Sequence, residues 1–239
     1  MAITRQNTLP DPNYRFGDSG ESTSGAFGPG FKSITFKSQT QIAKNLTNSG
    51  RMVRRFNSYH KWEISITYNP MTREEFEPVY NFLLDKQGSL EPFFVSLPHL
   101  RGPQDSTFAT YCQSNETPVD GFVASGSTSL KADGFTGSSG SPKRGDIFTL
   151  TDAYDSNHTK VYQVTSVEVN EAGKFETVVG DDERIIHFSP AVNRSVSDDT
   201  LINFHQPLIR VTMASDMQEY SLGSNGLYQF SLKLEEAQQ

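Results

Sequence analysis

The side chains that most often carry out chemistry are scattered through this sequence. No histidine lies four residues from another, and the five are His60, His99, His158, His187 and His205. A zinc site needs ligands that converge on one point, and its sequence signature usually includes a close pair. We therefore predict no metal site and interpret the histidines as structural side chains.

Nucleophilic and phosphate-binding chemistry have no recognisable motif either. Cys112 is the only cysteine, so an intrachain disulfide is impossible, and the sequence identifies no base for a catalytic thiol. We interpret Cys112 as a small packed side chain. The chain contains no Gly-x-Ser-x-Gly elbow, no Walker loop and no Gly-x-Gly-x-x-Gly fingerprint. We predict that the protein is not an enzyme, with no catalytic residues and no bound cofactor.

Two groups of polar side chains leave a choice between a site and a solvated turn. The residues of one group are consecutive: Asp181, Asp182 and Glu183. Those of the other are spread over a polar segment: Asp152, Asp155 and Asn157. Acidic groups of this kind could bind calcium or supply an acid/base pair, but the spacing of an EF-hand loop is absent. Short acidic runs before a strand are usually solvated turns, which is the interpretation we favour.

A cationic cluster, Arg51, Arg54 and Arg55, precedes the most regular strand pattern. In a chain with a net charge of −7 it could meet the carboxylates or a phosphate of a partner, and it could equally be a solvated loop. The acidic balance and the lack of interleaved aromatics argue against nucleic-acid binding, sequence-specific or otherwise. An acidic surface would instead suit a passage through which DNA slides without sticking.

The elements that must position these residues are mostly strands. Residues 60–68 alternate between apolar and polar side chains, with Trp62 on the apolar face. Residues 227–234 alternate as regularly near the C-terminus. The first choice among the possible pairings is that the two strands pair with each other, each with one face on a core.

One helix is expected, at about residues 73–87. A capping box over residues 72–75 marks its start, and apolar side chains follow at helical spacing. Pro78 conflicts with this helix because it removes a backbone donor, so we expect either a kink or a start nearer Glu74. Gly88 suits the left-handed residue that follows a last turn.

Two adjacent phenylalanines begin the strand after this helix. Only alternate residues of a strand share a face, so Phe93 and Phe94 must point to opposite faces. We expect one of them to pack under the helix, with the other at a neighbouring subunit or in a second core.

The strand pattern changes along the chain in a way that indicates two domains. Short strands separated by Gly, Ser and Pro turns fill residues 101–184, which is typical of a small β-barrel or sandwich. Within this block the apolar pattern changes phase between Val164 and Val167, as at a β-bulge or a sharp bend. We predict a mainly-β protein in which residues 1–100 and 185–239 form a discontinuous domain and the block is inserted.

The sequence shows no pattern typical of a targeting signal or a membrane span. The first residues contain no apolar run, so we expect no signal peptide, and no stretch approaches the roughly 18 apolar residues of a membrane span. With a single cysteine, the chain would tolerate a reducing cytoplasm.

The order of these elements resembles the distal tail and minor tail proteins of long-tailed bacteriophages. In those chains a basic segment leads into a Trp-bearing strand, and a helix that ends near a glycine is followed by an aromatic strand closed by proline. The matching residues here are Arg51 to Trp62, Phe82-Leu83, Gln87-Gly88, Phe93-Phe94-Val95 and Pro98.

The resemblance extends into the inserted block, where small barrels of such tail proteins have similar strands. The matching residues are Gly145-Asp146, Tyr162, Val164 and, in the later segment IIHFSPAV, Pro190. The glycine-rich segment of residues 17–30 and Pro78 have no counterpart in that pattern.

The resemblance implies a split tail-tube-like β-sandwich domain that carries an inserted barrel of the oligonucleotide/oligosaccharide-binding (OB) type. It implies a structural role in a hexameric ring at the distal end of the tail tube, joined to the baseplate or tail tip. The partners would be further copies of the chain, the tail-tube protein and hub or tail-tip proteins. The protein would be made in the host bacterial cytoplasm and lie in the virion tail. The residues we expect in its core and interfaces are Trp62, Gly88, Phe93, Phe94, Arg54 and Arg55.

A binding module is the alternative. The inserted block could bind a host-surface glycan during attachment, because sugar rings stack on aromatic side chains beside carboxylates and amides. The aromatic candidates are Phe108, Tyr111, Phe122 and Phe135, and their spacing selects none of them.

Overall fold

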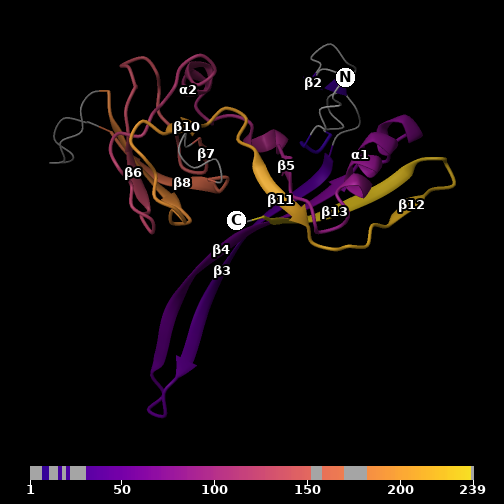
Figure 1. The fold of residues 1–239 in the computed structure, drawn as a ribbon, viewed down its shortest axis with the longest axis horizontal. Coiled ribbons are helices and arrows are strands. Elements are labelled where there is room, and N and C mark those ends of the chain that lie inside the picture. Colours follow the sequence, from indigo (N-terminus) through magenta and orange to yellow (C-terminus); the bar gives the residue numbers. More distant parts are fainter. Residues whose placement is uncertain are drawn as a thin grey trace. The chain divides into compact units, whose positions relative to one another are not determined.

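Strands are the predominant regular element of the structure, a computed structural model (Figure 1). It describes residues 7–10, 16–17, 20–21, 31–151, 158–169 and 182–237. These residues form thirteen strands, two α-helices and one short 3-10 helix, so the predicted mainly-β class is confirmed. The chain divides into two compact units: unit 1 comprises Met1–Val95 and Arg210–Gln238, and unit 2 comprises Ser96–Ile209.

Unit 1 is built on one six-stranded sheet. Its strands are β3 (Phe31–Leu46), β4 (Met52–Tyr68), β5 (Phe93–Val95), β11 (Ile209–Met213), β12 (Tyr220–Leu222) and β13 (Tyr228–Glu236). They lie in the order β3-β4-β13-β11-β5, and β12 also pairs with β13. A separate antiparallel pair consists of β1 (Phe16–Gly17) and β2 (Gly20–Glu21).

The predicted pairing of the Trp62 strand with the strand near the C-terminus is confirmed. β4 and β13 are antiparallel, with Ile64 opposite Leu234 and Ile66 opposite Leu232. These four side chains are buried, while their neighbours along each strand are half-buried or exposed. One face of the sheet therefore lies on the core, as the alternation predicts.

The helix α1 (Arg73–Asp85) covers the apolar face of this sheet. Phe76 and Leu83 are buried, and the ring of Phe76 stacks on that of Tyr228 with the centroids 4.6 Å apart. The predicted capping box is present, and the Glu75 carboxylate accepts a hydrogen bond of 2.8 Å from the backbone N–H of Thr72. The described part of unit 1 is thus a sheet covered by a helix, whereas the resemblance to tail proteins implies a β-sandwich.

The end of α1 differs in detail from the prediction. Pro78 lies inside the helix on an exposed position, so α1 loses one backbone hydrogen bond without ending there. The C-cap is Lys86, and both residues after it, Gln87 (φ 52°) and Gly88 (φ 73°), are left-handed. Gly88 has the predicted conformation but shares it with Gln87.

Gly88→Ala is expected to destabilise unit 1 more than Gly226→Ala does. Both glycines have a left-handed φ (73° and 75°), a conformation that costs an alanine about 1–2 kcal/mol. A Cβ atom at position 88 would also lie 2.9 Å from Oδ1 of Asp216, whereas no atom lies within 4 Å at position 226. Urea unfolding followed by the fluorescence of Trp62, the only tryptophan, measures both losses. Equal losses would contradict the role of the Asp216 contact.

β5 separates its two phenylalanines, as predicted. Phe93 is fully buried, and its ring meets that of Phe82 of α1 edge to face at 5.4 Å. Phe94 is half-buried, and its backbone N–H donates to the carbonyl of Asn7 while its carbonyl accepts from Leu9, both at 2.8 Å. Residues 7–9 therefore cover the outer edge of β5.

Unit 2 contains a five-stranded sheet and two short helices. The elements are η1 (Pro98–Leu100), α2 (Ser106–Tyr111), β6 (Ser129–Ala132), β7 (Ile147–Thr151), β8 (Val161–Glu168), β9 (Arg184–Ser189) and β10 (Leu201–Asn203), with the strand order β10-β7-β8-β9-β6. In the core the ring of Phe148 lies 5.5 Å from those of Tyr162 and Phe188. The predicted β-bulge is confirmed by a register shift between Val164 and Ser166.

The sheet of unit 2 does not close into the predicted barrel. Its end strands, β10 and β6, do not pair with each other. Residues 117–120 lie between them and hydrogen-bond to both, but form only isolated bridges, of Pro118 with Leu201 and of Val119 with Ala132. Pro118 has no N–H, so one hydrogen bond of a regular ladder is missing in this segment. Unit 2 also supplies α2, a second helix where the sequence predicts only one.

The border of unit 2 lies further along the chain than predicted. The sequence predicts an insert of residues 101–184, with residues 185–239 in the first domain. In the structure β9 lies between β8 and β6, and β10 pairs with β7, so residues 185–209 belong to unit 2. The alternation in this stretch resembles that of unit 1, and strand pairing cannot be read from alternation alone.

Candidate functional site

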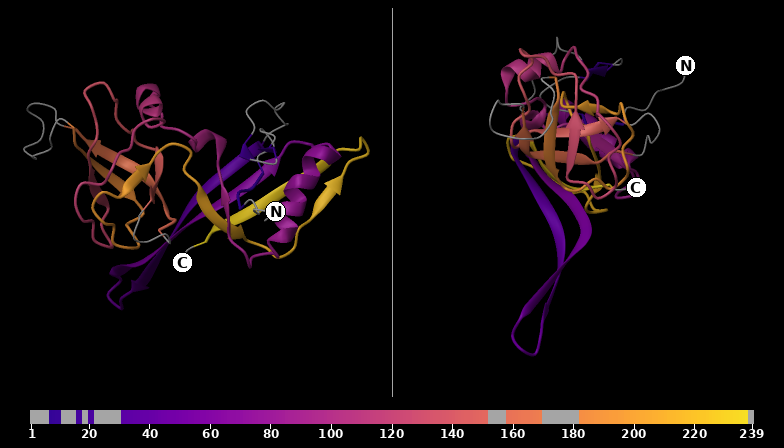
Figure 2. Two further views of the ribbon diagram at one scale, coloured as in Figure 1. Left: turned by 45° about the horizontal axis from the view of Figure 1, so that its top comes forward. Right: turned by 90° about the vertical axis from the view of Figure 1, so that its left-hand side faces the viewer.

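The longest strands, β3 and β4, run far beyond the sheet of unit 1 (Figures 1 and 2). β13 pairs with β4 only from Glu63 to Thr67, whereas β3 and β4 stay paired as far as Leu46 and Met52. Residues 38–62 therefore form a two-stranded projection with a turn at its tip, which we call the arm. Figure 2 shows the arm twisting as it leaves the sheet.

The arm is anchored at its root by the core of unit 1. Trp62 is 4% exposed, and its ring stacks on that of Phe36 with the centroids 4.4 Å apart. The backbone N–H of Trp62 donates to the buried carboxylate of Glu236 at 3.1 Å, and Nζ of Lys61 lies 2.5 Å from the Glu235 carboxylate. The last residues of β13 thus hold the base of the arm in place.

Beyond the root the arm exposes large apolar side chains. Directly opposed residues of two strands share a face, so Ile42, Leu46 and Met52 lie on one face of the ladder and Val53 on the other. Between 48% and 64% of each of these side chains is exposed. A two-stranded hairpin alone in water is marginally stable at best, because it has little apolar surface to bury. These side chains are therefore suited to contact with a partner.

The arm is also purely cationic. It contains five Lys and Arg residues and no Asp or Glu, and four of them lie beyond the root: Lys44, Arg51, Arg54 and Arg55. All four are exposed. Lys44 lies directly opposite Arg54, and like charges in this position destabilise a ladder. The cationic cluster that the sequence identified is thus part of a projecting strand and not a loop ahead of it.

The six residues singled out in the sequence lie in five separate places. Arg54 and Arg55 lie in the outer arm and Trp62 at its root. Gly88 lies at the end of α1, Phe93 is buried in the core of unit 1, and Phe94 lies beside residues 7–9. Only the two arginines are on a fully exposed surface, so the structure does not bring the six together.

The length of the arm was missed because its sequence lacks apolar alternation. Residues 37–46 are mainly polar or basic, and in residues 52–59 apolar and polar side chains do not alternate, whereas a half-buried strand would show an apolar stripe on one face. The available signal was the turn Asn48–Gly50 between two segments free of proline and acidic residues.

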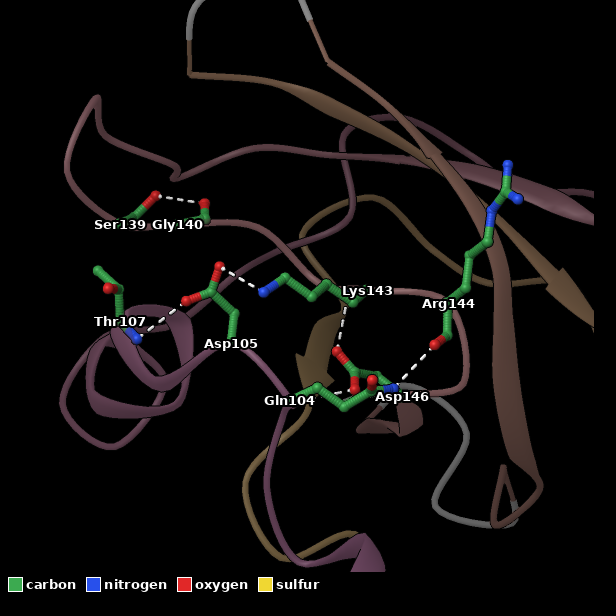
Figure 3. A network of polar contacts seen from close by, with 8 residues as sticks. All are labelled: Gln104, Asp105, Thr107, Ser139, Gly140, Lys143, Arg144 and Asp146. Carbon is green, nitrogen blue, oxygen red and sulfur yellow. Dashed lines mark hydrogen bonds and ion pairs between the residues drawn. The ribbon is translucent and has the colours of Figure 1, made fainter.

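Unit 2 contains a polar network around the start of α2 (Figure 3). Asp105 caps the helix by accepting a 3.0 Å hydrogen bond from the N–H of Thr107, which chiefly lowers the pKa of Asp105, and Nζ of Lys143 lies 3.5 Å away. The buried carboxylate of Asp146 accepts from the backbone N–H groups of Lys143 at 2.7 Å and Gln104 at 3.0 Å. These contacts join separate segments of unit 2, and we interpret the network as structural.

The thiol of Cys112 lies just after α2 and is half-buried. Burial, and to a lesser extent the charge of Asp146, raises its pKa to about 12. The thiolate is the nucleophilic form, so this cysteine is poorly suited to attack a substrate near neutral pH. Its surroundings agree with a packed side chain.

Acidic side chains gather around Lys131 in unit 2. Nζ of Lys131 lies 2.6 Å from the Asp120 carboxylate and 2.7 Å from that of Glu183. Among the described residues no group of three or more His, Cys, Asp or Glu side chains could hold a metal ion. Asp181 lies outside the described residues, as do Asp152, Asp155 and Asn157.

Asp133→Asn is expected to stabilise unit 2 at neutral pH. Burial raises the pKa of Asp133, and nearby carboxylates, those of Asp120, Asp182, Asp199 and Glu183, raise it further. A carboxyl whose pKa is higher in the folded than in the unfolded state destabilises the fold when it is ionised. This destabilisation is lost as the pH falls through the raised pKa, because the group is then protonated in the folded state. Urea unfolding should show a gain at neutral pH that shrinks in acid.

The matched control for this variant is Asp120→Asn in the same acidic group. It removes a carboxylate that is paired with Lys131, so no gain in stability is expected. A gain of equal size in both variants would mean that general charge reduction, and not the environment of Asp133, is responsible.

Two of the four aromatic residues considered for glycan binding are buried. Phe108 and Phe135 are buried in the core, with their rings 5.7 Å apart, and the hydroxyl of Tyr111 donates to the carbonyl of Gly134. Phe122, in contrast, is 70% exposed. A hollow of about 620 Å³ beside α2 is lined by Tyr111 and by hydroxyl and amide side chains: Ser106, Thr107, Thr110, Ser114, Asn115 and Ser138.

Comparison with known proteins does not assign this chain to a family. Comparison with protein-family models gives no match, and a search of curated proteins finds no similar sequence. In the part of the chain that the structure describes, no helix is long and apolar enough to cross a membrane. The arm is the feature that bears most directly on function.

Proposed function

We propose that this chain is a non-enzymatic structural protein that assembles into a hexameric ring at the distal end of a phage tail. The ring would join the tail tube to the baseplate or tail tip. The single observation that carries the proposal is the arm of unit 1, which projects from the sheet and exposes apolar side chains on both faces. An element of this kind gains stability only when a partner covers it.

The edges of the sheet in unit 1 also support self-assembly. Residues 7–9 pair with β5 at one end of the sheet, whereas β3 at the other end pairs with β4 alone among the described strands. An edge of sixteen residues that no other described strand covers offers N–H and C=O groups to another chain. A protein built this way is suited to extension by a neighbour.

The tail assignment comes from the ordered resemblance to distal tail and minor tail proteins. In that setting the partners are further copies of the chain, the tail-tube protein and hub or tail-tip proteins. The protein would be made in the host bacterial cytoplasm and end in the virion tail. With a net charge of −7, the ring could border a passage for DNA during ejection without binding it.

Negative-stain electron microscopy of the purified chain tests this function. We expect six-fold rings with a central hole. The control is a shortened arm that lacks residues 42–45 and 53–56, which are directly opposed pairs, so that the turn and the register are kept. The shortened variant should fold and fail to form rings. A wild-type chain that stays monomeric at every concentration would contradict self-assembly.

A second candidate function is glycan binding by unit 2 during host attachment. It is favoured by the hollow beside α2, where Tyr111 lies among hydroxyl and amide groups. A glycan array probed with the whole chain and with Asn115→Ala, which alters the lining of the hollow, tests it. Binding to bacterial surface sugars that this variant loses would support the second function, and silence across the array would leave the structural one.

A further inference from the structure

We propose that the arm docks on the acidic surface of a second copy of this chain, so that neighbouring subunits are joined by charge and apolar contacts along the arm. The inference rests on the proposed ring and names the partner of the arm. It differs from simple extension of the sheet, because pairing at the edge of β3 needs only backbone groups and is indifferent to charge.

Charge is segregated along the sequence to an unusual degree. The arm holds five of the 21 Lys and Arg residues and none of the 28 Asp and Glu residues, so its formal charge is +5. The remaining chain has 16 cationic and 28 acidic residues, hence a formal charge of −12. An acid-free stretch runs from residue 22 to residue 62. Every copy of the chain therefore carries both a cationic projection and an excess of carboxylates.

The cations of the outer arm have no carboxylate partner among the described residues of their own subunit. Within the described residues, Lys44, Arg51, Arg54 and Arg55 form no ion pair, and the contact of Arg54 is a 3.3 Å hydrogen bond from Nε to the sulfur of Met52. Lys44 and Arg54 repel each other across the ladder. Carboxylates supplied by a neighbour would replace this repulsion with attraction.

The apolar side chains of the arm favour a protein partner over a nucleic acid. Ile42, Leu46 and Met52 share their face with Lys44 and Arg54, so cationic and apolar groups alternate along one surface. Phosphate contacts require only the cations, whereas a protein surface can satisfy both kinds of group. The acidic remainder of a second copy supplies the complementary charge.

The test compares two charge reversals of equal size. Arg54→Glu with Arg55→Glu changes the arm, and Arg144→Glu with Lys233→Glu changes two exposed cations elsewhere, each pair altering the net charge by the same amount. Self-association is measured by analytical ultracentrifugation at low and high salt, and folding by circular dichroism. We expect the arm variant to weaken association by about tenfold or more, and the control to resemble wild type. Wild-type association should weaken as salt rises.

Lys44→Glu separates loss of docking from loss of the arm itself. This variant converts the repulsive pair with Arg54 into an attractive one, so hydrogen exchange within the arm should slow while self-association weakens. A variant that weakened association only by unfolding the arm would show faster exchange.

The outcomes distinguish this inference from the ring itself. Normal rings from the Arg54→Glu, Arg55→Glu variant would overturn arm docking and leave the ring standing. A wild-type chain without self-association at any salt would overturn both. Binding of a random-sequence DNA duplex that only the arm variant loses, with association unchanged, would overturn docking in favour of a nucleic-acid partner.

Discussion

Replacing Phe93 with alanine is expected to lower the free energy of unfolding of unit 1 by about 3–5 kcal/mol. Phe93 is fully buried in β5, and its ring packs edge to face against Phe82 of α1 at 5.4 Å. The substitution removes this apolar surface and leaves a cavity between the strand and the helix, and the close-packed surroundings relax only partly. Urea unfolding followed by the fluorescence of Trp62, in unit 1, measures the loss.

The neighbouring residue supplies the control for this variant. Phe94→Ala changes a half-buried ring on the opposite face and keeps the backbone hydrogen bonds with Asn7 and Leu9, so we expect a loss of about 1 kcal/mol or less. Losses of similar size at both positions would mean that β5 does not divide its two faces between a core and a half-exposed surface.

Trp62→Ala is expected to cost about 3–5 kcal/mol and also to loosen the arm. Trp62 is 4% exposed, stacks on Phe36 and meets the ring of His60 edge to face at 4.7 Å. Because these rings lie where the arm joins the sheet, the cavity opens at its anchor. Hydrogen exchange measured by mass spectrometry should show that the variant speeds exchange, relative to wild type, more in residues 38–60 than in unit 2.

An exposed position further along the arm provides the comparison for Trp62. Ile42→Ala removes a side chain that is 48% exposed, so the free energy of unfolding of the isolated subunit should change by no more than about 0.5 kcal/mol. If Ile42→Ala and Trp62→Ala were equally harmful to the isolated subunit, the anchoring role of the root would be wrong.

Much of unit 1 could be predicted because its residues combine periodic pattern with local signals. Trp62, Ile64 and Ile66 alternate with polar side chains, and they are buried as that alternation requires. Thr72 and Glu75 begin the helix through a capping contact that involves only neighbouring residues. Features that depend on a few adjacent side chains can be recognised without knowing the rest of the fold.

Other features depend on partners that a sequence does not reveal. The arm lacks a core stripe, so no pattern distinguishes it from a loop. The open edge in unit 2 depends on where Pro118 falls between β10 and β6, and the border of that unit depends on which strands pair with β9. The candidate site was therefore recognised only as a group of arginines, without the projection that presents them.

The anchoring of the arm has a consequence for synthesis. Lys61 contacts Glu235 across 174 residues, and unit 2 is encoded between them as one continuous segment. Loop closure over such a distance costs little more than over a shorter one, since each doubling of length adds only about 0.6 kcal/mol. The distance affects the order of folding more than the free energy. On a ribosome, the whole of unit 2 is synthesised after β4 and before β13, so β4 cannot pair with β13 until unit 2 has emerged. The arm is therefore anchored only at the end of synthesis. Chains released before Glu235 and Glu236 would lack the contacts that hold the base of the arm and would let them join an assembly.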